Sequence, residues 1–331
     1  MKVVLVTPYY HQFRGNTMTV QRISEGLRRL GIITEIVSIE ENHFPPLPPA
    51  DLVHGFNAYQ FYRYWTQRGT SSYPYLVTLT GTDLNHSLFQ ELTKDAVIQS
   101  LNGAQAIHVF NKEARTLLCQ EVPRLEHKTY LIPQGIMDFP DVQNHIEKEE
   151  GSFLFVLPAG IRRVKNVPSA ISMLTPLYER DPRIRLWIVG PVLEEEEGNN
   201  VRKLIEQNSN WIRFFGQVPH PEMGGIYRHA DVVLNTSLSE GQSTAILEAM
   251  AMGIPVLASD ISGNRDIVSH GQTGFLYRDD YDFSQHVRHL MENVELRKKM
   301  GIAGQEYVQN HHSAGKEVQE LAALYRHILQ H

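Results

Sequence analysis

The chain has 331 residues, of which 42% are hydrophobic and 21% charged; this composition is ordinary for a globular protein, and the length suffices for two domains. The formal net charge of −6 gives no support to nucleic-acid binding, which favours a basic face. The single cysteine, Cys119, excludes an internal disulfide and a cysteine-built zinc site, and it is compatible with a reducing cytosol. The N-terminal apolar run is too short for a signal peptide, and no run of about 18 apolar residues occurs. We therefore expect a cytoplasmic protein without a transmembrane segment.

Apolar strands alternate with helical stretches through the first half of the chain. A helix is expected over residues 17–30, ended by Gly31, and the proline-rich run at 45–49 predicts a stiff loop. Six strands are expected, at residues 3–7, 33–39, 52–54, 75–79, 106–110 and 129–132. Such alternation predicts a parallel sheet with helices on both faces.

A polar, acidic stretch at 138–152, DFPDVQNHIEKEEGS, is the predicted linker. The alternation of strands and helices then restarts, with a helix expected over 167–178 and a helical chain from 283 onward. Five strands are expected here, at residues 153–157, 184–189, 211–214, 232–234 and 256–258. We therefore expect an N-terminal domain at 1–145, a second domain at 146–312 and a terminal helical segment at 313–331.

Two glutamates eight positions apart, Glu240 and Glu248, bracket a turn between a short buried strand and a helix. Ser243 and Thr244 stand where that helix begins, so they can cap it, and its free amides can receive an anion. An apolar run, Ala-Met-Ala-Met, follows Glu248, and a carboxylate in such a helix needs a partner. This layout suits a ligand with phosphate in the middle and a sugar at each glutamate, as in a nucleotide-sugar. The alternative is a common Glu-Gly turn and a solvated helical glutamate.

The segment from 238 to 277 contains this Glu-x7-Glu motif, then Ala-Met-Ala-x-Gly-x-Pro-Val, then Gly-x-Thr-Gly. These pieces, in this order, resemble the glycosyltransferase family 4 (group 1) enzymes. The resemblance covers the second half of the chain strongly and the first half weakly. It implies the α/β architecture called GT-B, in which two Rossmann-like, doubly wound parallel-sheet domains face each other across a cleft. The terminal helix of this family crosses back to the first domain, and we expect the same here.

A turn at 158–166 follows a strand and precedes a helix at the start of the second domain. It contains Gly160 and two cations, Arg162 and Lys165, which can both aim at a diphosphate; the alternative is a basic surface turn. The resembling family places an arginine and a lysine here to hold the donor diphosphate. The two cations would neutralise the leaving diphosphate without a metal, and no His-Glu-x-x-His pattern or Asp-x-Asp at a strand end indicates a metal site.

The loop between the first strand and the first helix ends in Gly15 and Asn16. Gly15 permits close approach of the backbone to a ligand, and the following helix N-terminus favours an anion, so both are candidate donor-binding residues. The loop lacks a Gly-x-Gly-x-x-Gly fingerprint, so a dinucleotide enzyme is not indicated. The resembling family usually carries a Gly-Gly pair at this point.

The stretch at 78–85, TLTGTDLN, resembles a family loop that commonly contains His-Gly-Thr-Asp. Thr80 stands where many members have a histidine beside the transferred sugar, and it can still donate a hydrogen bond. Asp83 is either a helix cap or an acceptor-side carboxylate. Together with the loop at Gly15 and Asn16, this stretch resembles a smaller branch of the family, that of the glycosyltransferase-1-domain-containing protein and the selenosugar synthases.

Two further positions have open alternatives. Arg265 lies in a loop at 262–268 that the family places near the donor, and it either reaches phosphate or stays at the surface. His54 follows a strand of the first domain and is either a cleft residue or a hydrogen-bonded structural histidine.

The resemblance implies a metal-independent, retaining glycosyltransferase of EC class 2.4 that uses a UDP- or GDP-type sugar donor and no cofactor. Glu240, Arg162 and Lys165 would be catalytic, and Glu248 would accept hydrogen bonds from the ribose. The first domain would bind a small-molecule or glycan acceptor, and the lack of a basic amphipathic helix favours a soluble one. Because Thr80 replaces the histidine, two alternatives stay open: a nucleotide-sugar binding protein without transfer activity, and a GT-B-shaped sugar-nucleotide epimerase.

Overall fold

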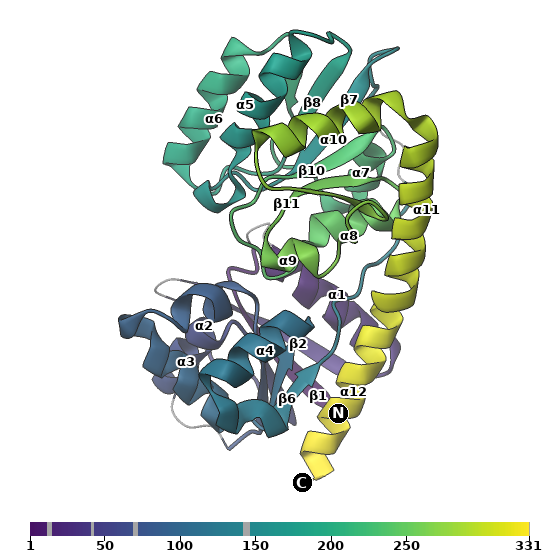
Figure 1. Cartoon of the computed structure of the whole chain (residues 1–331). Helices are drawn as coiled ribbons and strands as arrows, with labels where there is room; N and C mark the ends of the chain where they lie inside the picture. The colour runs from purple at the N-terminus through teal and green to yellow at the C-terminus, as the bar shows by residue number, and fades with distance from the viewer. Residues whose placement is uncertain (12–14, 41–42, 69–71, 142–145, 331) are drawn as a thin grey trace. The chain divides into compact units, whose positions relative to one another are not determined.

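The chain divides into two compact units in the computed structural model, which describes residues 1–11, 15–40, 43–68, 72–141 and 146–330. Unit 1 contains Met1–Met137 and His312–His331, and unit 2 contains Asp138–His311. Each unit is built on one six-stranded sheet in which every strand pair is parallel, with helices around it (Figure 1). The predicted α/β class with parallel sheets is confirmed.

The sheet of unit 1 has the strand order β2-β1-β3-β4-β5-β6. Its strands are β1 (Lys2–Pro8), β2 (Ile33–Ile39), β3 (Leu52–Phe56), β4 (Tyr75–Thr78), β5 (Ala106–Val109) and β6 (Thr129–Leu131). Alternate residues of β1 enter two different buried clusters, Val3 with one and Val4 with the other. Both faces of the sheet are therefore covered, as an all-parallel sheet requires.

The helical segments of unit 1 follow the strands or close the chain. They are α1 (Gly15–Arg29), α2 (Ala58–Gln67), α3 (Glu91–Gly103), α4 (Lys112–Glu121), α12 (Ala314–Gln330), the π-helical η1 (Asp83–Ser87) and the 3-10 helix η2 (Pro123–Lys128). Helix α12 lies beside α1 (Figure 1). Arg22 donates two hydrogen bonds to Glu317, at 2.8 and 2.9 Å, and both side chains are almost fully buried. The terminal helix is thus an integral part of unit 1.

The sheet of unit 2 has the strand order β12-β11-β10-β7-β8-β9. Its strands are β7 (Phe153–Pro158), β8 (Ile184–Val189), β9 (Ile212–Phe214), β10 (Val232–Asn235), β11 (Val256–Ser259) and β12 (Gly274–Tyr277). Its helices are α5 (Val167–Tyr178), α6 (Glu195–Gln207), α7 (His220–Tyr227), α8 (Thr244–Ala251), α9 (Ser262–Arg265), α10 (Asp280–Glu292), α11 (Val294–His311) and the 3-10 turn η3 (Arg163–Lys165). The order of strands reverses between β7 and β10, so a topological switch point lies there.

Unit 2 begins at Asp138, ahead of the boundary expected after residue 145. The ring of Phe139 explains this start, because its centroid lies 5.0 Å from that of His220 and 5.5 Å from that of Tyr227. The beginning of the predicted linker is therefore packed against α7.

Candidate active site

The carboxyl ends of β7, β10 and β11 carry a group of polar side chains in unit 2. Lys165 follows β7, Asn235 ends β10 and Ser259 ends β11. Because parallel strands end at the same edge of the sheet, residues far apart in sequence meet here, at the switch point where ligands bind in doubly wound sheets.

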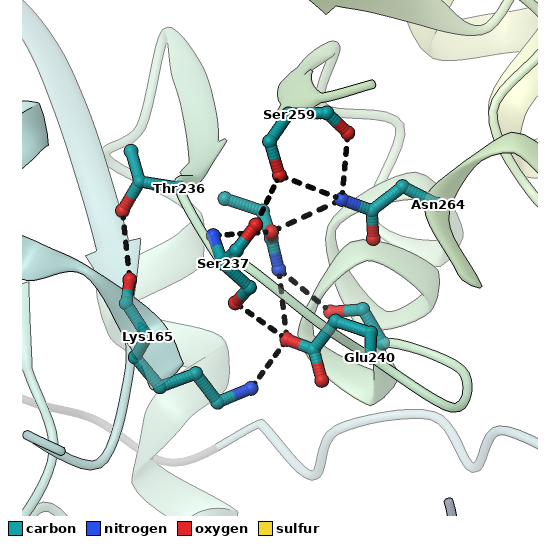
Figure 2. A network of polar contacts seen from close by, with 8 residues as sticks. Lys165, Thr236, Ser237, Glu240, Ser259 and Asn264 are labelled. Carbon is teal, nitrogen blue, oxygen red and sulfur yellow. Dashed lines mark hydrogen bonds and ion pairs between the residues drawn. The ribbon is translucent and has the colours of Figure 1, made fainter. Parts of the chain in front are cut away.

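Lys165 and Glu240 form an ion pair at this edge (Figure 2). The same carboxylate oxygen, Oε1, accepts a hydrogen bond from Ser237 Oγ at 2.7 Å and one from Asn235 Nδ2 at 3.3 Å. Burial would raise the pKa of Glu240, but the charge of Lys165 and the hydrogen bonds from Lys165, Ser237 and Asn235 outweigh it and hold the pKa below its usual value. Glu240 is therefore a fixed negative charge beside a fixed positive one.

A second set of hydrogen bonds holds the strand ends behind Glu240 (Figure 2). Asn264 Nδ2 donates to Asn235 Oδ1 at 3.1 Å and to the carbonyl of Ser259 at 3.0 Å. Ser259 Oγ donates to the carbonyl of Ser237 at 2.7 Å. Our sequence analysis did not single out Asn235, Ser237 or Asn264 as site residues. The available signal was the polar residue that ends each apolar strand.

Ser243 occupies the N-cap position of α8, and Thr244 is the first residue of that helix. Within the described part of the chain, however, the Ser243 hydroxyl makes no capping hydrogen bond. It accepts one from Asn235 Nδ2 at 3.1 Å instead. The expectation that the Ser243 side chain caps α8 is therefore wrong, because Asn235 engages it. The role of the α8 amides toward an anion stays a prediction.

Arg162 and Lys165 lie in one turn, in which the Lys165 amide donates to the Arg162 carbonyl at 2.9 Å. The Arg162 Nε is buried, and it has no hydrogen-bond partner among the residues that the structure describes. Gly160 lies in the same turn, and a Cβ there would lie 2.7 Å from Leu193 Cδ1, so the backbone and this side chain pack closely. The turn thus holds one cation in an ion pair and another with an unsatisfied buried donor.

Glu248 has a separate set of partners, which sequence analysis did not identify. Its Oε1 lies 2.7 Å from His220 Nε2, and its Oε2 accepts a hydrogen bond from the Tyr227 hydroxyl at 2.9 Å. Burial, and then the charge of Glu248, raise the pKa of Tyr227 well above its usual value. The expectation that this carboxylate needs a partner is confirmed, and α7 supplies both groups.

The candidate residues of unit 1 lie on two segments. Gly15 and Asn16 are the first residues of α1, while residues 12–14 of the same loop lie outside the described ranges. Thr80 Oγ1 accepts a hydrogen bond from Asn57 Nδ2 at 3.3 Å.

Asp83 is fully buried, and backbone amides occupy both of its carboxylate oxygens. Oδ2 accepts from the amide of Ala58 at 2.8 Å, and Oδ1 accepts from the amide of Thr80 at 2.9 Å. Burial raises the pKa of Asp83, against the opposing effect of these hydrogen bonds. The contacts correspond to the cap alternative, because Oδ1 also accepts from the amide of Leu84, in the segment that follows, at 3.2 Å, while Oδ2 binds the first amide of α2.

His54 and Arg265 fit the structural alternatives. His54 is fully buried, and its ring nitrogens lie 2.7 Å from the Tyr325 hydroxyl and 2.6 Å from Thr78 Oγ1. Arg265 is half exposed and pairs with Asp260 at 2.6 Å.

Solved structures with the same architecture are those of GT-B glycosyltransferases. The sucrose-phosphate synthase of Thermosynechococcus elongatus superposes with a TM-score of 0.83 at 16% sequence identity, over 100% of both chains. HepE of Anabaena, in complex with UDP-glucose, gives a TM-score of 0.79 at 17% identity and covers 99% of this chain and 100% of its own. At these identities the likeness shows the fold, which is GT-B.

The family profile of the group 1 glycosyl transferases matches residues 138–307, which is just over half of the chain. The chain therefore belongs to this family, and it is a glycosyltransferase of EC class 2.4 that takes a nucleotide-sugar donor. It is similar to the Glycosyltransferase 1 domain-containing protein 1 of Xenopus tropicalis, with 28% identity over 312 residues that cover 90% of each chain. The expected family is confirmed.

None of the described helices combines the length and the apolar character that crossing a bilayer requires. Within the described ranges, no three His, Cys, Asp or Glu side chains gather closely enough to hold a metal ion.

Proposed function

We propose that the protein is a retaining glycosyltransferase that moves a sugar from a UDP- or GDP-type donor to a soluble acceptor without a metal ion. The observation that carries this proposal is the Lys165–Glu240 ion pair at the switch point of unit 2, in the turn that also holds Arg162. The complex of the structural neighbour HepE with UDP-glucose supports a donor of this class.

The two cations suit the donor diphosphate. Arg162 has a buried donor nitrogen that a phosphate oxygen would satisfy, and Lys165 would be shared between Glu240 and the diphosphate. When the bond from the sugar to the diphosphate breaks, negative charge grows on the leaving oxygen, so fixed positive charges stabilise the transition state more than the ground state. No metal ion is then needed for this task.

The two glutamates would hold the carbohydrate parts of the donor on either side of the diphosphate. Glu240 would accept hydrogen bonds from the transferred sugar, and Glu248 would accept them from the ribose. The amides of Ser243 and Thr244 at the start of α8 would assist the phosphates. The separate groups of side chains that hold the two carboxylates support this division.

The remaining candidates complete the donor and acceptor sites in this proposal. Gly160, Gly15 and Asn16 would contact the donor, while Thr80 would lie on the acceptor or sugar side, in a loop that Asp83 holds through the Thr80 amide. The acceptor hydroxyl would attack the anomeric carbon on the face from which the diphosphate leaves, so the configuration would be retained. An oxygen of the leaving diphosphate would take the proton of the acceptor hydroxyl.

Thermal-shift measurements with UDP, GDP, ADP and their sugars test the donor class, because a ligand that binds the folded state raises the melting temperature. The double variant Arg162→Ala/Lys165→Ala should lose the shift and the turnover of the donor. Arg163→Ala removes an exposed cation from the same turn and serves as the matched control. An undiminished shift in the double variant would contradict the proposed diphosphate site.

Product analysis separates the proposed function from its alternatives. A transferase releases the nucleoside diphosphate slowly from one donor in the absence of acceptor, whereas a pure binding protein releases none. An epimerase would form a sugar isomer instead. Thr80 motivates the comparison, because it replaces the family's histidine and its hydroxyl contacts Asn57.

A further inference from the structure

The carboxylate of Glu248 is held at both oxygens by one short helix. His220 and Tyr227 are the first and last residues of α7 (His220–Tyr227), and each contacts a different oxygen of Glu248. A carboxylate only accepts hydrogen bonds, so His220 donates through Nε2 and Tyr227 donates through its hydroxyl. The two contacts fix the plane of the carboxylate as well as its position.

Counting acceptor sites shows what remains for a ligand. An ionised carboxylate has about four lone-pair sites, two on each oxygen. Among the residues that the structure describes, His220 occupies one site on Oε1 and Tyr227 one on Oε2, which leaves one site on each oxygen. The Glu248 side chain keeps 10% of its surface exposed, so it is not sealed from solvent. Two neighbouring acceptors on one rigid group match two neighbouring hydroxyls on one ring.

The helix that supplies these donors is itself braced. Phe139 packs on the rings of both His220 and Tyr227. A Cβ at Gly224, in the middle of α7, would lie 2.6 Å from Phe139 Cβ, so helix and aromatic ring are in close contact. Tyr227 is fully buried, and its hydroxyl is aimed at Glu248. These contacts limit the freedom of both donors.

We infer that His220 and Tyr227 are positioning residues, which orient Glu248 so that its two remaining acceptor sites receive the vicinal 2′- and 3′-hydroxyls of the donor ribose. This inference rests on the ribose role proposed for Glu248. Neither residue needs to touch the nucleotide. Each acts by holding the carboxylate, so loss of either should weaken recognition of the diol and nothing else.

The test compares two forms of one nucleotide. The dissociation constant is measured by calorimetry for UDP and GDP, and then for the 2′,3′-dideoxy form of whichever one the wild-type protein binds. The variants are Glu248→Gln, Tyr227→Phe, His220→Ala and His220→Gln, each with its melting temperature. Tyr227→Phe removes one hydroxyl and keeps the ring, and glutamine at 220 can donate through a nitrogen placed like Nε2.

We expect Tyr227→Phe and His220→Ala to weaken binding of the ribose form about tenfold, the usual effect of a lost hydrogen bond to a charged group. Binding of the dideoxy form should change by less than about twofold, and His220→Gln should recover most of the loss. If these residues had only a general structural role, the variants would instead weaken binding of both nucleotide forms equally or would only lower the melting temperature.

Different results would overturn the positioning role of α7 and the ribose role of Glu248. If Glu248→Gln weakens binding of the ribose form more than that of the dideoxy form, and the α7 variants show no such difference, the positioning inference is overturned while the ribose role of Glu248 stands. If the wild-type protein binds the ribose and dideoxy forms equally, the ribose role fails, and the inference fails with it.

Discussion

Loss of the Glu240 charge should affect nucleotide binding and sugar transfer in opposite directions, because Lys165 and Glu240 are proposed to bind different parts of the donor. Glu240→Gln removes the negative charge that holds Lys165 and keeps the size of the side chain. The side chains of Lys165 and Glu240 are 17% and 10% exposed, so the pair is intermediate between an exposed ion pair and a fully buried one. We take its strength as about 1–2 kcal/mol, discounted from a buried pair for screening by solvent.

Freeing Lys165 should therefore tighten binding of UDP or GDP about five- to thirtyfold, because 1.4 kcal/mol corresponds to a tenfold change. Sugar transfer should fall at least about a hundredfold in the same variant, since Glu240 no longer holds the sugar. Calorimetry with the nucleotide and a turnover assay with the donor measure the two effects.

Glu195→Gln is the matched control, because Glu195 is an exposed residue of the same unit that pairs with Arg202. Weaker nucleotide binding together with normal turnover in Glu240→Gln would refute the reasoning.

Three further predictions concern the two units. Glu317→Ala leaves Arg22 buried without its partner, so the free energy of unfolding should fall by about 3–5 kcal/mol in urea denaturation; a loss below about 1 kcal/mol would contradict the buried pair. Burial, and then His108, hold the pKa of His54 well below its usual value, so the folded protein binds this proton more weakly than the unfolded chain. The contribution of His54 to the free energy of unfolding should therefore be fully present above about pH 6.5 and should decrease as the pH falls below that value. Denaturation of the wild-type protein and of His54→Gln at about pH 7.5 and 5.5 measures this effect, and an equal pH dependence of the two proteins would disprove it. Asn264→Ala removes the donor that holds Asn235 and Ser259 and leaves buried oxygens without it, so turnover should fall about tenfold and the melting temperature by a few degrees; normal turnover would count against a role for this network.

The sequence predicted the sheets well because parallel strands buried on both faces are nearly continuous apolar runs. All six strands of unit 1 and five of the six in unit 2 were expected. Strand β12 (Gly274–Tyr277) was missed, because it begins at the last glycine of the Gly-x-Thr-Gly motif, where the residue types favour a turn.

In the candidate site, too, the sequence identified some residues and missed others. Glu240 and Lys165 were each marked by a local motif, and the structure brings them into contact across 75 positions of sequence. Their supporting residues had no such motif. Asn264 of α9 donates to Asn235 of β10, and His220 and Tyr227 of α7 reach Glu248 of α8. Such pairs depend on which elements the fold places side by side, and residue type alone does not reveal that.

Ser243 shows how a sound local rule can be overridden. A serine before a helix usually caps it, but here Asn235 donates to the serine hydroxyl. The tertiary contact decides the outcome, because both side chains are buried together at the end of β10.

The most direct measurement is a crystal structure of the protein with its nucleotide-sugar donor. We predict that Arg162 and Lys165 lie within hydrogen-bonding distance of the diphosphate, Glu240 contacts the sugar and Glu248 contacts the ribose hydroxyls. A donor bound elsewhere, or bound with these four side chains out of contact, would disprove the proposed site.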